Sequence, residues 1–334
     1  MQNEQIVLNE RPEGLPKDDT FKYEAIQTAE PSTGEVQLKS IYISVDPYMR
    51  GRMNDSKSYV KPYEIGKPID GHVLAKVIKS EVEYLEEGDY VTGVLPWQRI
   101  ITTDANQVTK IPSTEVPLHL YLSILGMPGM TAYTGLLEIG KPKAGETVVV
   151  SAASGAVGSV VGQIAKIKGA KVVGIAGGKE KTQYLTDTLG FDAAVDYKGD
   201  DFEAQLAASV PNGIDVYYEN VGGKLSDEVF KHLNTFARVP VCGAISTYNN
   251  TQTEMGPRIQ ETLVKSQALM QGFVVGQFAE HFKEASEQLA KWVAEDKIKS
   301  QVTIDEGFDQ LPNAFRKLFS GENFGKQVVK ISEE

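Results

Sequence analysis

The sequence contains a single cysteine, Cys242, in 334 residues. One thiol excludes an internal disulfide and any metal site built from several thiolates, and it suits a reducing compartment. Lysine and arginine form no run and the formal net charge is −11, so we expect no nucleic-acid partner. No apolar run approaches the roughly 20 residues that span a bilayer, and the first residues lack the basic and apolar regions of a secretory signal. These absences predict a soluble, cytoplasmic protein without membrane contact.

The sequence pattern divides the chain into two regions. Residues 1 to about 115 are punctuated by Gly and Pro and contain short, near-alternating apolar segments, which are typical of a β-rich domain. From Thr147 onward, short β-branched runs are separated by stretches long enough for crossover helices. This rhythm predicts an α/β domain with a parallel, doubly wound sheet. The six runs are 147–152, 171–176, 193–197, 214–220, 238–244 and 271–276.

For other segments the sequence pattern predicts the structure less clearly. Residues 116–140 indicate a helical hinge that is broken at Pro128-Gly129. Two apolar runs near the end, 301–307 and 325–331, either extend the doubly wound sheet or return to the first domain. Periodicity alone does not choose between these arrangements.

The stretch "SAASGAVGS", residues 151–159, has the pattern of a dinucleotide-binding turn. Such a turn needs a small first residue for the bend, a Gly where backbone approaches the pyrophosphate, and a Gly where the helix packs on the strand. Ala153, Gly155 and Gly158 occupy these places, and a methyl group is tolerated at Ala153 if its φ stays negative. Because the turn follows a strand and opens a helix, nucleotide binding is favoured over simple packing.

The residues after the second run bear on the choice of cofactor. NAD-binding domains often carry an Asp or Glu there for the ribose hydroxyls, but this chain has Gly177-Gly178-Lys179-Glu180-Lys181. Glycines leave room for a bulky group and lysines neutralise a 2′-phosphate, which favours NADP. On these residues alone, the lysines are equally consistent with the solvated start of a helix, and Glu180 keeps NAD open.

Several blocks match one family in the family's own order. They are "SVDPYMRGRM" (44–53), "GMPGMTAYTGLLEIG" (126–140), 151–159, "YYENVGG" (217–223), "CGAISTYN" (242–249), 272–275 and 323–330. The chain resembles the zinc-independent medium-chain dehydrogenase/reductase superfamily, and within it the prostaglandin reductase, alkenal double-bond reductase and curcumin reductase group. The resemblance implies a GroES-like domain at 1–122 and 303–334, and a Rossmann domain for NADP at 123–302. Homodimers are common in this family, so we expect one here.

The resemblance also carries cofactor contacts onto this sequence. Lys181 and Tyr197 would hold the 2′-phosphate, Asn220 would contact the cofactor from the end of the fourth strand, and Asn323 would lie near the nicotinamide. The other cofactor positions in the matching blocks are Met127, Thr131, Ala153, Gly155, Ala156, Val157, Gly158, Gly178, Cys242, Ile245, Phe273, Val274 and Val275. Cys242 is expected there as a small packing residue, because no histidine can be assigned to it as a base.

The activity implied by the resemblance is hydride transfer from NADPH to the β-carbon of an α,β-unsaturated ketone or aldehyde, followed by protonation of the α-carbon. Negative charge builds on the carbonyl oxygen, so a donor is needed beside it. Tyr248 matches the family's tyrosine near the carbonyl and the nicotinamide ribose, and a phenol donates without carrying charge. Tyr48 and Tyr59 are candidates for lining the substrate.

Alternatives remain at this point. An NADPH quinone reductase would use the same cofactor, and a non-catalytic NADPH-binding protein would keep the same fold. Arg50 and Arg52 would attract an acidic substrate, although such arginines more often form ordinary salt bridges. A catalytic zinc is not expected, because Asp46 stands where a cysteine ligand would be sought and His72 lacks a following Glu.

Overall fold

The computed structural model describes residues 3–334, which divide into two compact units. Unit 1 comprises residues 3–122, Val302–Asn323 and Gln327–Glu334, and unit 2 comprises Ser123–Gln301 and Phe324–Lys326. No helix within residues 3–334 combines the length and the apolar character that a membrane crossing requires.

The short segment 324–326 belongs to unit 2, whereas the sequence prediction placed all of 303–334 in the first domain. Backbone hydrogen bonds give the reason. Gly325 N–H donates to Ser154 O at 3.1 Å, and Lys326 N–H donates to Gln301 O at 2.9 Å. The chain therefore touches the glycine turn of unit 2 before it enters its last strand.

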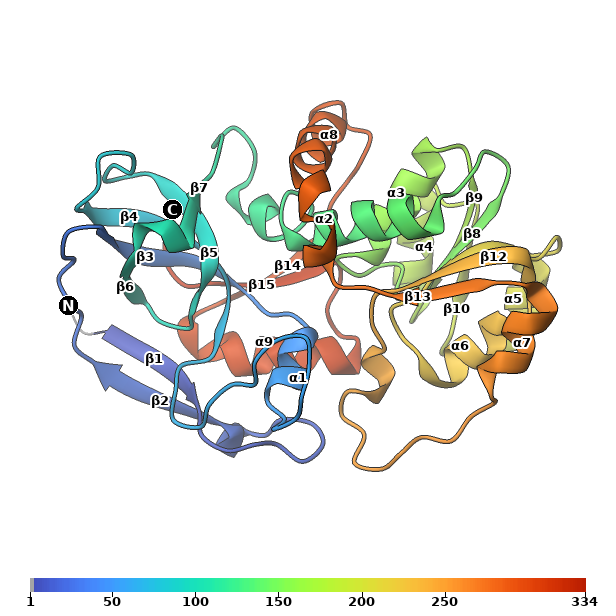
Figure 1. Ribbon diagram of the computed structural model, residues 1–334, viewed down its shortest axis with the longest axis horizontal. Helices are drawn as coiled ribbons and strands as arrows, with labels where there is room; N and C mark the ends of the chain where they lie inside the picture. Colours follow the sequence, from blue (N-terminus) through green and yellow to red (C-terminus); the bar gives the residue numbers. More distant parts are fainter. Residues whose placement is uncertain (1–2) are drawn as a thin grey trace. The chain divides into compact units, whose positions relative to one another are not determined.

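Unit 1 is β-rich and contains a two-stranded sheet (β1-β2) and a seven-stranded sheet. Along the larger sheet the order is β14-β15-β3-β4-β5-β7, with β6 paired to β3 (Figure 1). The two apolar runs that the pattern left open, β14 and β15, thus join this sheet. The elements are β1 (Asn3–Leu8), β2 (Phe21–Ile26), β3 (Glu35–Ser44), α1 (Tyr48–Arg52), β4 (Asp70–Ser80), β5 (Tyr90–Pro96), β6 (Ile100–Asp104), β7 (Val108–Lys110), β14 (Val302–Glu306), α9 (Leu311–Ser320) and β15 (Lys326–Lys330).

Unit 2 contains the six-stranded parallel sheet that the sequence predicts, in the order β10-β9-β8-β11-β12-β13 (Figure 1). The order reverses between β8 and β11, which is the switch point where doubly wound sheets bind their ligands. The strands are β8 (Thr147–Val150), β9 (Lys171–Ala176), β10 (Ala193–Asp196), β11 (Ile214–Tyr218), β12 (Leu233–Val241) and β13 (Leu269–Gly272). The helices are α2 (Met127–Thr134), α3 (Gly158–Ile167), α4 (Lys179–Asp187), α5 (Phe202–Ser209), α6 (Gly223–Phe230), α7 (Ile259–Ser266) and α8 (Phe282–Ala294).

Helices cover both faces of this sheet. The expected apolar stripe of α3 is buried at Val160, Val161, Ile164 and Ala165, while Val157 precedes the helix and is partly exposed. On the opposite face, α5 and α6 pack on strands β8 to β12 in one apolar cluster, to which they contribute residues such as Leu206. Both layers leave the carboxyl ends of the strands to the connecting loops.

The expected break at Pro128-Gly129 is wrong, because α2 begins there. Pro128 lies in the first turn, where its missing N–H costs no helical hydrogen bond. Gly129 lets the helix start against the preceding segment, since a Cβ on it would lie 1.8 Å from Ile124 O. The helix then continues as a π-helix over Gly135–Gly140.

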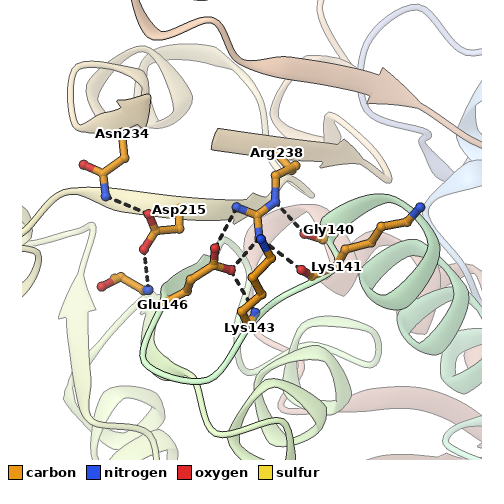
Figure 2. Close-up of polar contacts among 8 residues, drawn as sticks. Gly140, Lys141, Lys143, Glu146, Asp215, Asn234 and Arg238 are labelled. Carbon is orange, nitrogen blue, oxygen red and sulfur yellow. Dashed lines mark hydrogen bonds and ion pairs between the residues drawn. The ribbon is translucent and has the colours of Figure 1, made fainter. Parts of the chain in front are cut away.

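An ion-paired arginine fixes the far end of this π-helix near the amino ends of the strands. Arg238 Nε donates to Gly140 O at 2.9 Å and Nη2 donates to Lys141 O at 3.1 Å, while the guanidinium also pairs with Glu146 just before β8 (Figure 2). The arginine thus satisfies carbonyls that the end of a helix leaves without partners. It ties α2 and its extension to the sheet at the edge opposite the cofactor loops.

Candidate active site

The candidate site is formed by the loops at the carboxyl ends of the six parallel strands. Loops after each strand carry predicted cofactor residues: Ala153, Gly155, Ala156, Val157 and Gly158 after β8, Gly178 and Lys181 after β9, Tyr197 after β10, Asn220 after β11, Cys242, Ile245 and Tyr248 after β12, and Phe273, Val274 and Val275 after β13. Because parallel strands end at the same edge, the fold gathers these residues, which lie between positions 153 and 275, onto one rim.

The glycine turn accommodates its alanine by two adjustments. The left-handed backbone is at Ala152, with φ 48°, so Ala153 itself is spared a positive φ. The Ala153 methyl is fully buried against Gly174 of β9, where an added Cβ would lie only 2.9 Å from it. Gly158 remains necessary for packing, since a Cβ there would lie 2.4 Å from Ala152 O. At Gly155 an added Cβ meets only Ala152 O, at 3.1 Å, which leaves this backbone accessible from outside the protein.

A buried carboxylate, Glu219, organises the switch point between β8 and β11. It is 3% exposed, and its Oε1 accepts hydrogen bonds from Ser151 Oγ at 3.1 Å and from two backbone N–H groups, Val221 at 2.7 Å and Gly222 at 3.0 Å. Its other oxygen accepts from the Ser226 hydroxyl. These bonds fix the turn that carries the predicted cofactor contact Asn220.

Asn220 is held between the two strand ends. Its Nδ2 donates to Ser151 O at 2.8 Å, and its backbone N–H donates to Ser151 Oγ at 2.9 Å. Its carbonyl accepts from Ile245 N–H at 3.2 Å, which links the loop after β11 to the loop after β12. One donor of the Asn220 side chain is therefore used to join the ends of β8 and β11.

Tyr248 ends a short 3-10 helix, Ile245–Thr247, after β12. Its hydroxyl oxygen accepts a hydrogen bond from Ala244 N–H at 3.1 Å. Burial raises the pKa of the Tyr248 phenol above its usual value of 10.0, and Cys242 and Glu219 act in the same direction against the Ala244 hydrogen bond. The phenol is thus neutral at physiological pH and retains its proton for donation.

Aromatic packing connects α2 to the end of β11. Tyr218 is fully buried, its hydroxyl donates to Thr131 O at 2.8 Å, and its ring meets Phe273 edge to face with centroids 6.3 Å apart. Met127 belongs to the same helix, and its carbonyl accepts from Thr131 Oγ1 at 2.8 Å. Thr131 is therefore joined to the sheet through Tyr218, and Met127 is joined to Thr131.

Burial raises the pKa of the neighbouring Cys242 thiol to about 12, which suits the expected packing role.

A basic pair lies at the ends of β9 and β10. The pKa of Lys181 is lowered, first by burial and then by the charge of Lys198, against the opposing effect of Glu180. Lys198 lies over the ring of Tyr197, with its Nζ 6.0 Å from the centroid. Two ammonium groups that repel each other beside a phenol have the chemistry that suits a doubly charged anion, which is the role predicted for Lys181 and Tyr197.

Asp196 holds together the two loops that carry this basic pair. Its Oδ1 accepts from Gly178 N–H at 2.8 Å and from Lys198 N–H at 3.0 Å. Gly178 caps α4 with φ 91°, a conformation that glycine adopts readily, and an added Cβ would meet open space. Gly177 leaves no such space, because the Tyr197 and Lys198 side chains fill it.

Three functional candidates were missed by sequence reasoning: Lys198, Glu219 and Ser151. Lys198 directly follows the predicted Tyr197, so a second lysine beside the expected 2′-phosphate site was a readable signal. Glu219 precedes Asn220 in the same way, but only the fold shows that its carboxylate turns inward to cap its own loop. Of the remaining predicted residues, Tyr48, Tyr59 and Asn323 belong to unit 1. Within residues 3–334 no three His, Cys, Asp or Glu side chains form a group that could hold a metal ion.

Comparison with known proteins identifies the family. Residues 4–111 match the model described as the N-terminal domain of oxidoreductase, and residues 156–292 match the one described as zinc-binding dehydrogenase. The putative NADP-dependent oxidoreductase YfmJ of Bacillus subtilis is 52% identical over 333 residues, which cover 99% of this chain and 98% of that protein. The chain belongs to the medium-chain dehydrogenase/reductase superfamily, in its zinc-independent reductase group.

Two further relatives of this reductase group carry more specific names. The NADPH-dependent curcumin reductase of Escherichia coli is 44% identical, with 99% of this chain and 97% of that protein covered. The crystal structure of CurA in complex with NADPH from Vibrio vulnificus superposes with a TM-score of 0.94 at 43% identity, covering 99% of this chain and 100% of that one. The expected superfamily and its fold, a β-rich N-terminal part with a Rossmann sheet, are confirmed.

Proposed function

We propose that this protein is an NADPH-dependent reductase of the carbon–carbon double bond of α,β-unsaturated ketones or aldehydes. It works without zinc, and it adds hydride to the β-carbon and a proton to the α-carbon. The observation that carries the proposal is the neutral Tyr248 phenol, set at the carboxyl end of β12 with its oxygen bonded to Ala244 N–H and its proton retained. Relatives named curcumin reductase, 2-alkenal reductase and prostaglandin reductase, each at least 42% identical, support it.

The residues at the rim fit NADPH. Gly155 exposes backbone at the start of α3, whose amino end favours a pyrophosphate. Lys181, Lys198 and Tyr197 supply charge and a hydroxyl for a 2′-phosphate, whereas NAD would leave the two ammonium groups without an anion. Phe273 and Thr131 lie with Tyr218 at the opposite end of the rim, where the nicotinamide half is expected.

When bound, NADPH supplies the hydride. Tyr248 then stabilises the negative charge that builds on the substrate carbonyl oxygen, because a neutral donor in a partly buried site is preorganised for that charge. Ala244 N–H withdraws charge from the phenol oxygen and so strengthens its O–H as a donor. Tyr48 and Tyr59 are proposed to line the substrate, with Asn323 beside the nicotinamide.

Purified protein tests the proposal directly. With NADPH and a panel of enones, enals and quinones, we expect NADPH oxidation with enones and enals, and a saturated carbonyl product by mass spectrometry. Turnover with quinones alone would identify a quinone reductase. Tight NADPH binding by calorimetry without turnover of any compound would identify a non-catalytic binding protein.

A homodimer is proposed on the exposed edge of the Rossmann sheet. Strand β13 ends the sheet, all four of its residues are exposed, and Leu269 is 51% exposed beside Val264 of α7 at 77%. An apolar, unpaired strand edge is a template for pairing with a second copy. Light scattering checks this, and Leu269→Lys should shift the mass to that of a monomer. A cytoplasmic location is proposed on the single cysteine, which suits a reducing compartment.

A further inference from the structure

The guanidinium of Arg52 in α1 is held by several groups of unit 1. Its two Nη atoms donate to the two carboxylate oxygens of Asp70, and its Nε donates to Lys61 O at 3.0 Å. The group also lies 3.9 Å above the ring of Tyr63, whose hydroxyl donates to Asp70 O at 2.6 Å. Because the guanidinium already makes three hydrogen bonds and a cation–π contact, and the side chain is only 10% exposed, pairing of Arg52 with a ligand anion would disrupt this arrangement.

The neighbouring Arg50 is committed to structure. It is 3% exposed, and its guanidinium donates to Gly14 O at 2.9 Å, to Pro12 O at 3.1 Å and to Asn54 Oδ1 at 2.7 Å. Burial lowers the pKa of this guanidinium. The two arginines that the sequence offers for an acidic substrate are therefore both used by the protein itself.

The surroundings of Tyr48 are acidic as a result. The charges that act on its phenol are the carboxylates of Asp46 and Asp70 and the guanidinium of Arg52. Asp70 is the more exposed member of its ion pair, with 33% of its side chain accessible against 10% for Arg52. The pKa of Tyr48 is raised by burial first and then by Asp46, with Arg52 acting in the opposite direction and Asp70 in the same direction as Asp46. An anionic group placed here would lose water and meet net negative charge.

We infer that Asp70 determines the charge of the substrate: by holding Arg52, it makes the surface around Tyr48 select enones with an uncharged chain and reject those with a carboxylate. This specificity rests on the proposed function, because it concerns the substrate of that same reaction. The selectivity comes from disfavouring the acid. The neutral compound gains no new contact, whereas the carboxylate of the acid is repelled by the negative charge around Tyr48. Asp70 is thus a specificity-determining residue outside the hydride-transfer chemistry.

A matched pair of substrates tests the inference: a medium-chain aliphatic enone that ends in a carboxylate, and the methyl ester of the same compound. We expect the wild-type protein to reduce the ester with a kcat/KM about tenfold or more above that of the acid. Asp70→Asn keeps the size of the side chain, removes one negative charge and releases that of Arg52, so it should raise kcat/KM for the acid and leave that for the ester nearly unchanged.

A second variant moves the same ratio in the opposite direction. Arg52→Gln leaves the Asp70 charge uncompensated, so it should lower kcat/KM for the acid further relative to the ester. Asp18→Asn is the matched control, because Asp18 also belongs to unit 1 and pairs with an arginine, Arg316 at 2.6 Å, but does not act on Tyr48. It should leave the ratio of ester to acid at the wild-type value.

The outcomes distinguish a failure of the role of Asp70 from a failure of the proposed reaction. Equal kcat/KM for acid and ester in the wild type, or equal ratios in Asp70→Asn and Asp18→Asn, overturns the role of Asp70 while reduction of the ester upholds the proposed reaction. Opposite shifts in Asp70→Asn and Arg52→Gln support the role, because loss of structure would lower both rates together. Absence of turnover with both compounds in every variant removes the proposed function, and this inference with it.

Discussion

The hydroxyl oxygen of Tyr248 accepts a hydrogen bond from the backbone N–H of Ala244, 3.1 Å away. This contact depends on Gly243, because a Cβ there would lie 2.8 Å from the same oxygen. An oxygen that already accepts from the backbone directs its own proton elsewhere, and it is a better donor for that reason. The sequence "CGAISTYN" therefore encodes both the tyrosine and the glycine that lets the backbone hold it.

Tyr248→Phe tests whether that proton matters. The change removes the donor while keeping the ring, so we expect kcat to fall about a hundredfold or more, with little change in the melting temperature. In the wild type, kcat should stay level as the pH rises toward 10, because burial holds the pKa of the phenol above 10.0, and it should fall only when the phenol ionises. Unchanged turnover of a good enone by Tyr248→Phe would remove this residue from the mechanism.

Glu219→Gln should change both stability and pH dependence. The amide has one acceptor atom where the carboxylate has two, so at least one of the bonds to Ser226, Ser151 or the loop N–H groups is lost, at a cost of roughly 1–3 kcal/mol. Because the Glu219 charge raises the pKa of Tyr248, its removal lowers that pKa, and the alkaline fall in kcat should begin at a lower pH.

Asp215→Asn is the control for this shift. Asp215 lies on β11, the strand that Glu219 follows, but it accepts from Thr147 N–H at 2.8 Å, at the amino end of the sheet (Figure 2). It should lower stability without moving the alkaline limb of the pH profile. If Glu219→Gln and Asp215→Asn have the same pH profile, Glu219 acts on stability alone.

Lys198→Ala should weaken NADPH much more than NADH. A charged hydrogen bond to the 2′-phosphate contributes roughly 1.5–3 kcal/mol, so KM for NADPH should rise about ten- to a hundredfold while KM for NADH changes little. Lys181→Ala is expected to act in the same sense, because the charge of Lys198 lowers the pKa of Lys181 and the two ammonium groups therefore lie close together. Lys179→Ala, in the same helix, is the control. Equal losses for both cofactors in Lys181→Ala and Lys198→Ala would show that the 2′-phosphate lies elsewhere.

Much of this arrangement is readable in the sequence because it follows local rules. Six β-branched runs with helical spacing determine a parallel sheet, and Gly155 and Gly158 mark its phosphate turn. The π-helix after α2 and the inward carboxylate of Glu219 are not readable in this way, since both involve partners far along the chain, such as Arg238 and Ser151. Likewise, the sequence does not show whether Arg52 is available to a ligand. Its partner Asp70 lies 18 positions away, and only the fold places the two side chains against each other.

Ala153 in the phosphate turn gives the sharpest test of such long-range compensation. Its methyl occupies space that Gly174 of β9 leaves open, 2.9 Å from where a Cβ on Gly174 would lie. Gly174→Ala should therefore destabilise the fold by roughly 1–3 kcal/mol through overpacking against Ala153, Leu185 and Phe191. Ala153→Gly alone should destabilise it by about 1–2 kcal/mol, through the lost buried methyl and the added backbone freedom.

The double variant Ala153→Gly with Gly174→Ala separates this compensation from two unrelated defects. Residues in contact do not have additive effects, and here the methyl group is only transferred from the turn to the strand. We expect the free energy of unfolding, measured by urea denaturation, to fall by less than the sum of the two single losses. A strictly additive result would mean that the turn tolerates its alanine without help from Gly174.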